Sequence, residues 1–133
     1  MDQAECERGR DLRARAQGKA TDAFTEGMRS IDPRLLEWAD GWIFGNVWDD
    51  EADFQDRMIV AIVALAATGK TQQLKNYLYG ALQDGVPPRR IHESLMMLPV
   101  YVGFPTALAS LTLWQEVVQA SRRRGMDIDL PVE

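Results

Sequence analysis

The sequence predicts an all-α protein of six or seven helices, and three observations support this fold class. Apolar residues recur at helical spacing through most of the chain. The alternation of β-branched and polar residues that is typical of strands is scarce. Glycine, proline and acidic turn signals divide the sequence into short blocks. With 133 residues, of which 46% are apolar and 26% charged, we expect a single globular domain over residues 1–133.

The first part of the chain is predicted to form three helices. Two of them cover residues 4–17 and 20–31. The third starts at Asp32-Pro33, because aspartate can cap a helix and proline fits the first helical position. Gly45-Asn46 is expected to end it. Its apolar face is predicted from the i, i+3, i+4 pattern to be Leu35, Trp38, Ala39, Trp42 and Ile43, and the tryptophans are interpreted as core or subunit-contact residues.

A buried helix is predicted at residues 58–67, after an acidic irregular stretch at residues 48–54. Periodicity alone leaves a buried strand open for this apolar run. Its four alanines favour a helix that is covered on all sides, and Gly69 is a suitable C-cap. The acidic stretch is interpreted as a solvated loop, since Asp49, Asp50, Glu51 and Asp53 lack the spacing of a calcium loop.

The next two helices are delimited by turn residues. Thr71 is a potential cap for one helix, which Asp84-Gly85 ends, and Pro87-Pro88 opens the other. Their inward faces are predicted to be Leu74, Tyr77, Leu78, Ala81 and Leu82 in the first and Ile91, Leu95 and Leu98 in the second.

A break and a last helix complete the chain. Pro99 interrupts the preceding helix, because proline lacks the backbone N–H and clashes with the turn before it. Residues 101–105 form a junction in which Gly103 can adopt a positive φ. The last helix runs to about Arg124, and residues 126–133 are expected to be extended. Its inward side is predicted to be Leu108, Leu111, Trp114, Val117 and Val118.

Charge and composition exclude several classes of partner. The net charge of −5 argues against nucleic acid, because phosphate binding needs a basic face. The basic run at residues 122–124 is interpreted as complementing a helix dipole. Residues 58–67, the longest apolar run, have about half the length of a membrane span, so no membrane partner is expected. Cys6 is the only cysteine, which excludes an intramolecular disulfide and favours a reducing, cytoplasmic location.

Four short motifs follow one another in the second half of the chain. They are GKTQQL at residues 69–74, ALQDGV at 81–86, IHESL at 91–95 and YVGFP at 101–105. In this order and spacing they resemble the carboxymuconolactone decarboxylase family, whose motifs read G-[RK]-x-x-E-L, A-L-x-N-G-V, E-I-x-E-x-L and Y-x-G-x-P. The upstream segment WIFGNVW at residues 42–48 and Arg57 are also similar to that family, so the likeness covers nearly the whole chain.

The resemblance implies an all-α bundle of the alkylhydroperoxidase-like superfamily whose subunits associate as trimers or hexamers. It also implies decarboxylation or an allied isomerisation of a small carboxylated or lactone-type molecule, without a metal or organic cofactor. Superfamily members that reduce peroxides use a Cys-x-x-Cys pair. Because Cys6 is a lone thiol, a disulfide relay is excluded here.

Two departures from the family concern its common histidines. The positions that match them hold Tyr77 and Met97. His92, the only histidine, is one residue away from the position of the family glutamate, which is Glu93. His92 is therefore interpreted as a surface or capping residue.

Three residues are candidates for catalysis. Glu93 matches the family glutamate and is a potential general acid or base if it is buried; the alternative is a surface carboxylate near a helix start. Tyr77 is a potential proton donor or oxyanion ligand, or simply a core residue. Tyr101 belongs to the junction, which either lines a pocket or serves only packing.

Four residues are candidates for substrate binding. Arg57 is able to hold a substrate carboxylate by a bidentate pair, or else forms an ion pair with Asp53 or Asp56. The other three are pocket-lining candidates from the family-like segments: Trp48, Met97 and Phe104.

Two functions of different classes remain open. The first is a cofactor-independent enzyme of the decarboxylase type. The second is a non-catalytic member that binds a small molecule or assists a partner enzyme, which the replacement of both histidines by Tyr77 and Met97 favours. A purely structural oligomer is a third interpretation.

Overall fold

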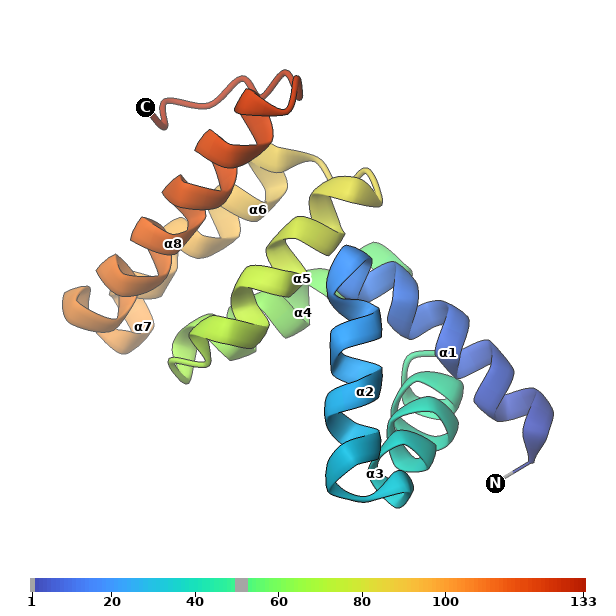
Figure 1. Ribbon diagram of the computed structural model, residues 1–133. Coiled ribbons are helices and arrows are strands. Elements are labelled where there is room, and N and C mark those ends of the chain that lie inside the picture. Colours follow the sequence, from blue (N-terminus) through green and yellow to red (C-terminus); the bar gives the residue numbers. More distant parts are fainter. Residues whose placement is uncertain (1, 50–52) are drawn as a thin grey trace. The chain divides into compact units, whose positions relative to one another are not determined.

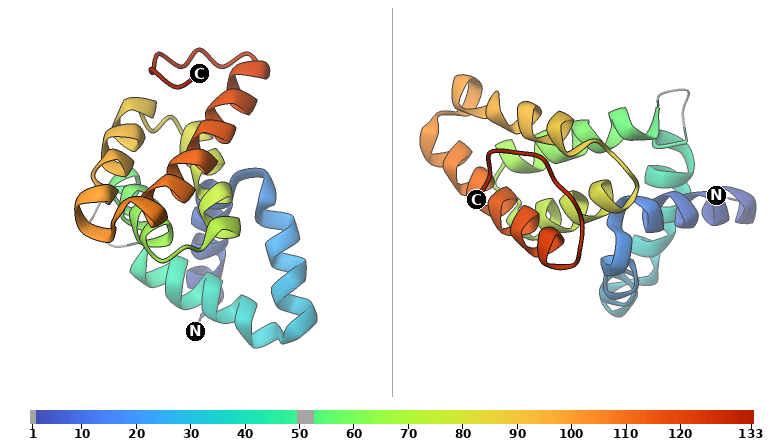
Figure 2. Two further views of the ribbon diagram at one scale, coloured as in Figure 1. Left: turned by 90° about the vertical axis from the view of Figure 1, so that its left-hand side faces the viewer. Right: turned by 90° about the horizontal axis from the view of Figure 1, so that it is seen from above.

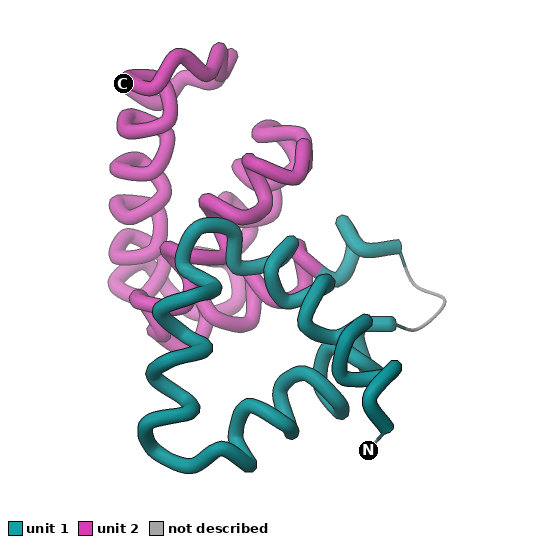
Figure 3. The backbone as a smooth tube through the Cα atoms, turned by 45° about the vertical axis from the view of Figure 1, so that its right-hand side comes forward, with its two compact units in different colours: residues 1–57 teal, residues 58–133 magenta. Residues whose placement is uncertain are grey.

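The computed structural model describes residues 2–49 and 53–133, and within these ranges it is all-α, as predicted (Figure 1). The described part contains eight α-helices, one short 3₁₀ helix and one π-helix, but no strand. None of these helices is long and apolar enough to cross a bilayer. Asp50 and Glu51 of the acidic loop lie outside the described residues. The helices form two compact units, Met1–Arg57 and Met58–Glu133 (Figure 3), and the expected single domain stays a prediction.

Unit 1 consists of a helical N-terminal segment that folds back on itself. Its elements are α1 (Gln3–Gln17), η1 (Gly18–Ala20), α2 (Thr21–Ile31), α3 (Pro33–Glu37) and the π-helix η2 (Trp38–Val47). Asp32 caps α3 as predicted, since its Oδ1 accepts a hydrogen bond from the backbone N–H of Arg34 at 2.9 Å. The predicted third helix thus changes from α to π winding at Trp38 and ends two residues beyond Gly45.

The core of unit 1 is a close contact between α1 and η2. A Cβ atom added at Gly9 would lie 1.6 Å from the carbonyl oxygen of Asp40, and one at Gly45 would lie 2.5 Å from that of Glu5. A buried ion pair joins the same two helices, with Arg13 Nε 2.7 Å from Asp40 Oδ1. Losing one partner of such a pair typically costs about 3–5 kcal/mol.

The apolar face predicted for the third helix is not the face that packs against α1. Trp38, Trp42 and Ile43 are 48%, 60% and 37% exposed. The face that meets α1 consists mostly of small side chains: Ala39, Asp40, Gly41, Phe44 and Gly45 are buried there. Helix backbones approach this closely only across small residues, so the tryptophans are turned outward.

Unit 2 is built around a long C-terminal helix. Its elements are α4 (Phe54–Ala67, of which residues 58–67 belong to this unit), α5 (Thr71–Gln83), α6 (Pro88–Met96), α7 (Leu98–Val102) and α8 (Phe104–Arg123). Helix α8 contacts α5, α6 and α7, and Ser110 Oγ donates a hydrogen bond to the carbonyl of Ala66 at 3.2 Å. Thr71 is the first residue of α5, whose N-cap is Lys70 rather than Thr71.

The core of unit 2 largely follows the predicted faces. Most of the predicted inward residues are buried, and only Leu108 is exposed, at 54%. The buried set is Leu74, Leu78, Ala81, Leu82, Ile91, Leu95, Leu98, Trp114, Val117 and Val118. The prediction that residues 58–67 are covered on all sides is wrong, since Val60 is 67% exposed. This helix buries one stripe, Met58, Ile62 and Ala66, because its neighbours pack against one side.

The predicted break near Pro99 is confirmed. Helix α6 ends at Met96, and α7 begins at Leu98 with Pro99 in its first turn. Gly103 then adopts φ +81°, a left-handed conformation that favours glycine, and α8 starts at Phe104. Tyr101 therefore lies on a short helix of its own.

Candidate functional site

Five of the seven predicted site residues lie in unit 2. Tyr77 is on α5, Glu93 on α6, Met97 between α6 and α7, Tyr101 on α7, and Phe104 at the start of α8. Trp48 and Arg57 belong to unit 1. The residues of each unit are therefore described separately.

An exposed stretch of unit 2 carries three of these residues. Met97, Tyr101 and Phe104 are 51%, 76% and 66% exposed. They belong to a run of large exposed apolar side chains, called here the apolar strip: Met96, Met97, Val100, Tyr101, Phe104 and Leu108. The break at Met97 and the turn at Gly103 lie within this strip, whose side chains are exposed on unit 2.

Glu93 precedes the apolar strip by one helical turn, on α6. Its side chain is 63% exposed, and its Oε1 lies 3.6 Å from Nη1 of Arg89, also on α6. Exposed ion pairs of this i, i+4 kind contribute only about 0.3–0.5 kcal/mol. The pair therefore opens easily, and the Glu93 carboxylate is available to another partner.

Tyr77 lies half-buried on the face of α5 that enters the core. Its neighbours along this face, Leu74, Leu78 and Ala81, are fully buried. The position agrees with the predicted inward face. The tyrosine therefore contributes to the packing of α5, and its partial exposure still leaves part of the ring accessible.

Trp48 in unit 1 is part of an aromatic cluster. Its ring centroid is 4.9 Å from that of Phe44 and 5.7 Å from that of Phe54, and the guanidinium carbon of Arg15 lies 3.8 Å from the Phe54 centroid. Contacts of this geometry stabilise packing. Arg57, in the first turn of α4, is half-buried, while Asp53 accepts a hydrogen bond from the backbone N–H of Gln55 at 2.7 Å.

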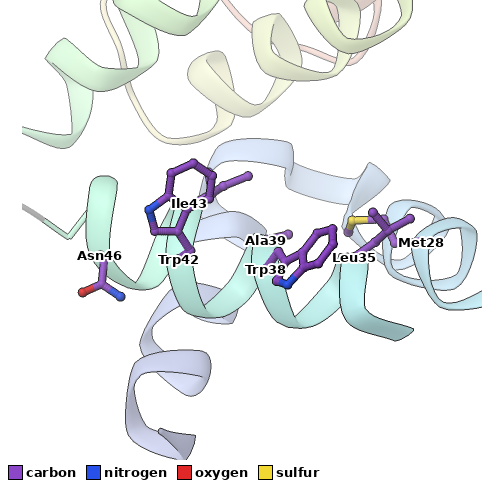
Figure 4. Close-up of a pocket in the computed structure, with 7 residues that line it drawn as sticks. All are labelled: Met28, Leu35, Trp38, Ala39, Trp42, Ile43 and Asn46. Carbon is purple, nitrogen blue, oxygen red and sulfur yellow. The ribbon is translucent and has the colours of Figure 1, made fainter. Parts of the chain in front are cut away.

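A pocket that the sequence analysis missed lies within unit 1. It has a volume of about 670 Å³ and is formed by α2, α3 and η2 (Figure 4). Its lining consists of Met28, Leu35, Trp38, Ala39, Trp42, Ile43 and Asn46. The lining is mostly apolar, and the amide of Asn46 contributes a polar group whose Nδ2 donates to the carbonyl of Gly41 at 2.6 Å. The sequence did not predict this pocket, because its tryptophans were interpreted as core or subunit-contact residues.

Two comparisons with known proteins show what this chain is similar to. A family model described as "Carboxymuconolactone decarboxylase family" matches residues 33–116, more than half of the chain. A 4-carboxymuconolactone decarboxylase from Acinetobacter baylyi is 22% identical over 118 residues, which cover 87% of this chain and 88% of that protein. All seven predicted site residues fall inside the matched segment.

Proposed function

Because the chain belongs to the carboxymuconolactone decarboxylase family, we propose that it acts on a small carboxylated or lactone-type molecule by cofactor-free acid–base chemistry. The reaction would be a decarboxylation or an allied isomerisation. The name of the A. baylyi relative supports the substrate class. The lone cysteine supports a reducing, cytoplasmic setting.

The observation that carries this proposal is the position of Glu93 next to the apolar strip. A carboxylate able to leave a weak ion pair lies on α6 one turn before the apolar strip, and the strip carries the exposed phenol of Tyr101 on α7. Decarboxylation leaves an electron pair on carbon, which must be delocalised and then protonated. In this proposal Glu93 transfers the proton as the general acid or base, and Tyr101 or Tyr77 donates a hydrogen bond to the developing oxyanion.

The remaining residues would bind the substrate. In unit 2, Met97 and Phe104 offer exposed apolar side chains. In unit 1, Arg57 is proposed to bind a carboxylate and Trp48 a ring. Acid–base chemistry works best where water is excluded. The exposure of the apolar strip therefore supports a site that a second copy of the chain completes, in a trimer or hexamer.

The test combines assembly and turnover. Native mass spectrometry measures the subunit number, and CO₂ release from 4-carboxymuconolactone measures activity. Replacing Glu93 with Gln should lower turnover by about 100-fold or more, the usual contribution of a general acid or base. Glu116→Gln, at an exposed position of α8, is the matched control and should retain activity. Full activity of the Glu93→Gln variant would contradict the catalytic assignment, and a monomer would contradict the shared site.

The second candidate function is binding without catalysis, and the unit 1 pocket favours it. The pocket is lined by Met28, Trp38 and Trp42 among others, and none of the described residues in its lining is ionisable. Such a lining suits an apolar ligand and offers no proton donor. Nile red is a suitable neutral probe: it should bind the native chain, and Trp42→Ala, which removes an exposed side chain from the pocket wall, should weaken its binding about tenfold. Equal binding by both proteins would count against this function.

A further inference from the structure

A smaller pocket surrounds the only histidine of the chain, within unit 2. Its volume is about 360 Å³, inside the range of roughly 300–1,000 Å³ that is common for small-molecule sites. Helix α6, helix α8 and the C-terminal segment form its walls. The lining residues are His92, Met96, Leu108, Leu111, Thr112, Trp114, Gln115, Pro131, Val132 and Glu133.

The C-terminal wall of this pocket is held in place by Arg122. The segment after α8 has no helix and turns back from its end (Figure 2). Arg122 Nη2 donates to the carbonyls of Ile128 and Leu130 at 2.8 and 3.1 Å, and Nη1 donates to that of Val132. Arg122 therefore anchors the C-terminal segment, a role beyond the predicted complement to the helix dipole.

Two further hydrogen bonds fasten the same segment. Gln119 Nε2 donates to the carbonyl of Glu133 at 2.5 Å. Arg89 Nη2, on α6, donates to the carbonyl of Asp129 at 3.3 Å. The wall is thus attached to both helices that form the rest of the pocket.

His92 has a defined hydrogen-bonding state in this pocket. The indole Nε1–H of Trp114, which is 1% exposed, donates to His92 Nδ1 at 3.1 Å. An Nδ1 atom that accepts a hydrogen bond carries no proton, so the neutral ring carries its proton on Nε2. Nε2 makes no hydrogen bond to any residue within 2–49 and 53–133. His92, predicted to be a surface or capping residue, is instead half-buried and offers one oriented donor.

We propose that this pocket, called here the His92 pocket, binds a small uncharged molecule with an apolar ring and a carbonyl oxygen. The carbonyl would accept from His92 Nε2–H. Leu111, Val132 and their neighbours would contact the ring, and Thr112 and Gln115 supply further polar atoms. The carboxylate of Glu133 lines the same pocket and disfavours an anion. This site takes an uncharged ligand and does not depend on the proposed decarboxylase activity.

Benzamide and benzoate form a matched pair of probes for the His92 pocket. They have the same ring and a carbonyl group, but only benzoate is charged. Two-dimensional ¹H–¹⁵N spectra of the full chain report on the Trp114 indole N–H, which should respond because it is hydrogen-bonded to the ring that holds the ligand. Benzamide should shift this signal with a dissociation constant on the order of 1 mM, and benzoate should bind at least tenfold more weakly.

Two variants separate this pocket from other sites. Thr112→Phe fills the pocket without changing the Trp114–His92 bond and should abolish the benzamide shift. Ala109→Phe, at an exposed position of α8 outside the lining, is the matched control and should preserve it. The proposal is overturned if benzamide leaves the Trp114 signal of the folded native chain unchanged, if Thr112→Phe binds like the native chain, or if benzoate binds as tightly as benzamide.

Discussion

Unit 1 and unit 2 are both helical, but they bury different kinds of side chain. In unit 1, α1 and η2 meet across Gly9 and Gly45 and share the buried Arg13–Asp40 pair. In unit 2, the helices are held apart by large apolar residues such as Ile62, Leu78 and Trp114. The helical spacing of apolar residues therefore predicts the buried residues correctly in unit 2, where large apolar side chains fill the core. It fails in unit 1, where small residues form the contact.

The difference explains where each unit exposes its aromatic residues. A contact made of small residues has no room for an indole, so Trp38 and Trp42 of unit 1 line an open pocket instead. In unit 2 the apolar strip is exposed for another reason: the break at Pro99 and the turn at Gly103 direct a short helix outward. In both units the candidate site therefore lies where large apolar side chains are exposed instead of buried.

The largest expected effect comes from the close contact of unit 1. Gly9→Ala should destabilise the fold by more than about 3 kcal/mol, because the added Cβ meets the backbone oxygen of Asp40 and neither helix can yield without separating. The measurement is the free energy of unfolding from urea denaturation followed by far-UV circular dichroism. Gly27→Ala, in α2 with no atom within 4 Å of the new Cβ, should instead stabilise by about 0.5–1 kcal/mol. Equal effects of the two substitutions would refute the close contact.

A pair of tryptophan substitutions tests the contrast between the two cores. Trp114→Ala should lower the free energy of unfolding by about 3–5 kcal/mol, since it removes a buried side chain that is 1% exposed. Trp42→Ala should change the free energy of unfolding by less than about 0.5 kcal/mol, since that side chain is 60% exposed. Thermal denaturation of both variants beside the native chain provides the measurement. A large loss for Trp42→Ala would mean that its indole is covered.

The smallest expected effect concerns pH and the cap of α3. The Arg34 side chain, followed by its backbone N–H, lowers the pKa of Asp32 below its ordinary value of 3.8. A carboxyl group with a lowered pKa in the folded state stabilises the fold above pH 3.8, and this contribution is lost as the pH falls through the folded-state pKa. Asp32→Asn should therefore show a slightly weaker dependence of stability on pH below about 4. Identical pH profiles of variant and native chain would argue against the interaction of the Asp32 carboxylate with the Arg34 side chain.

The prediction of the site from the sequence was uneven for physical reasons. Motif order placed the seven site residues inside a segment that the family model matches, so the family could be recognised from residues alone. Burial could not be predicted in this way. Glu93 was expected to act if buried, whereas its side chain is 63% exposed, because what covers a helix face depends on neighbours distant in sequence. The His92–Trp114 bond joins residues 22 positions apart and has no local signal.

The sequence by itself determined the helical class, most helix boundaries, the break at Pro99 and the family, because turn residues, caps and short motifs act within a few residues. The tertiary structure alone decided which faces are buried. It turned Trp38 and Trp42 outward, paired Arg13 with Asp40, and placed the C-terminal segment and His92 around one pocket. These outcomes depend on how closely two backbones approach, which is a property of pairs of helices and not of either sequence segment.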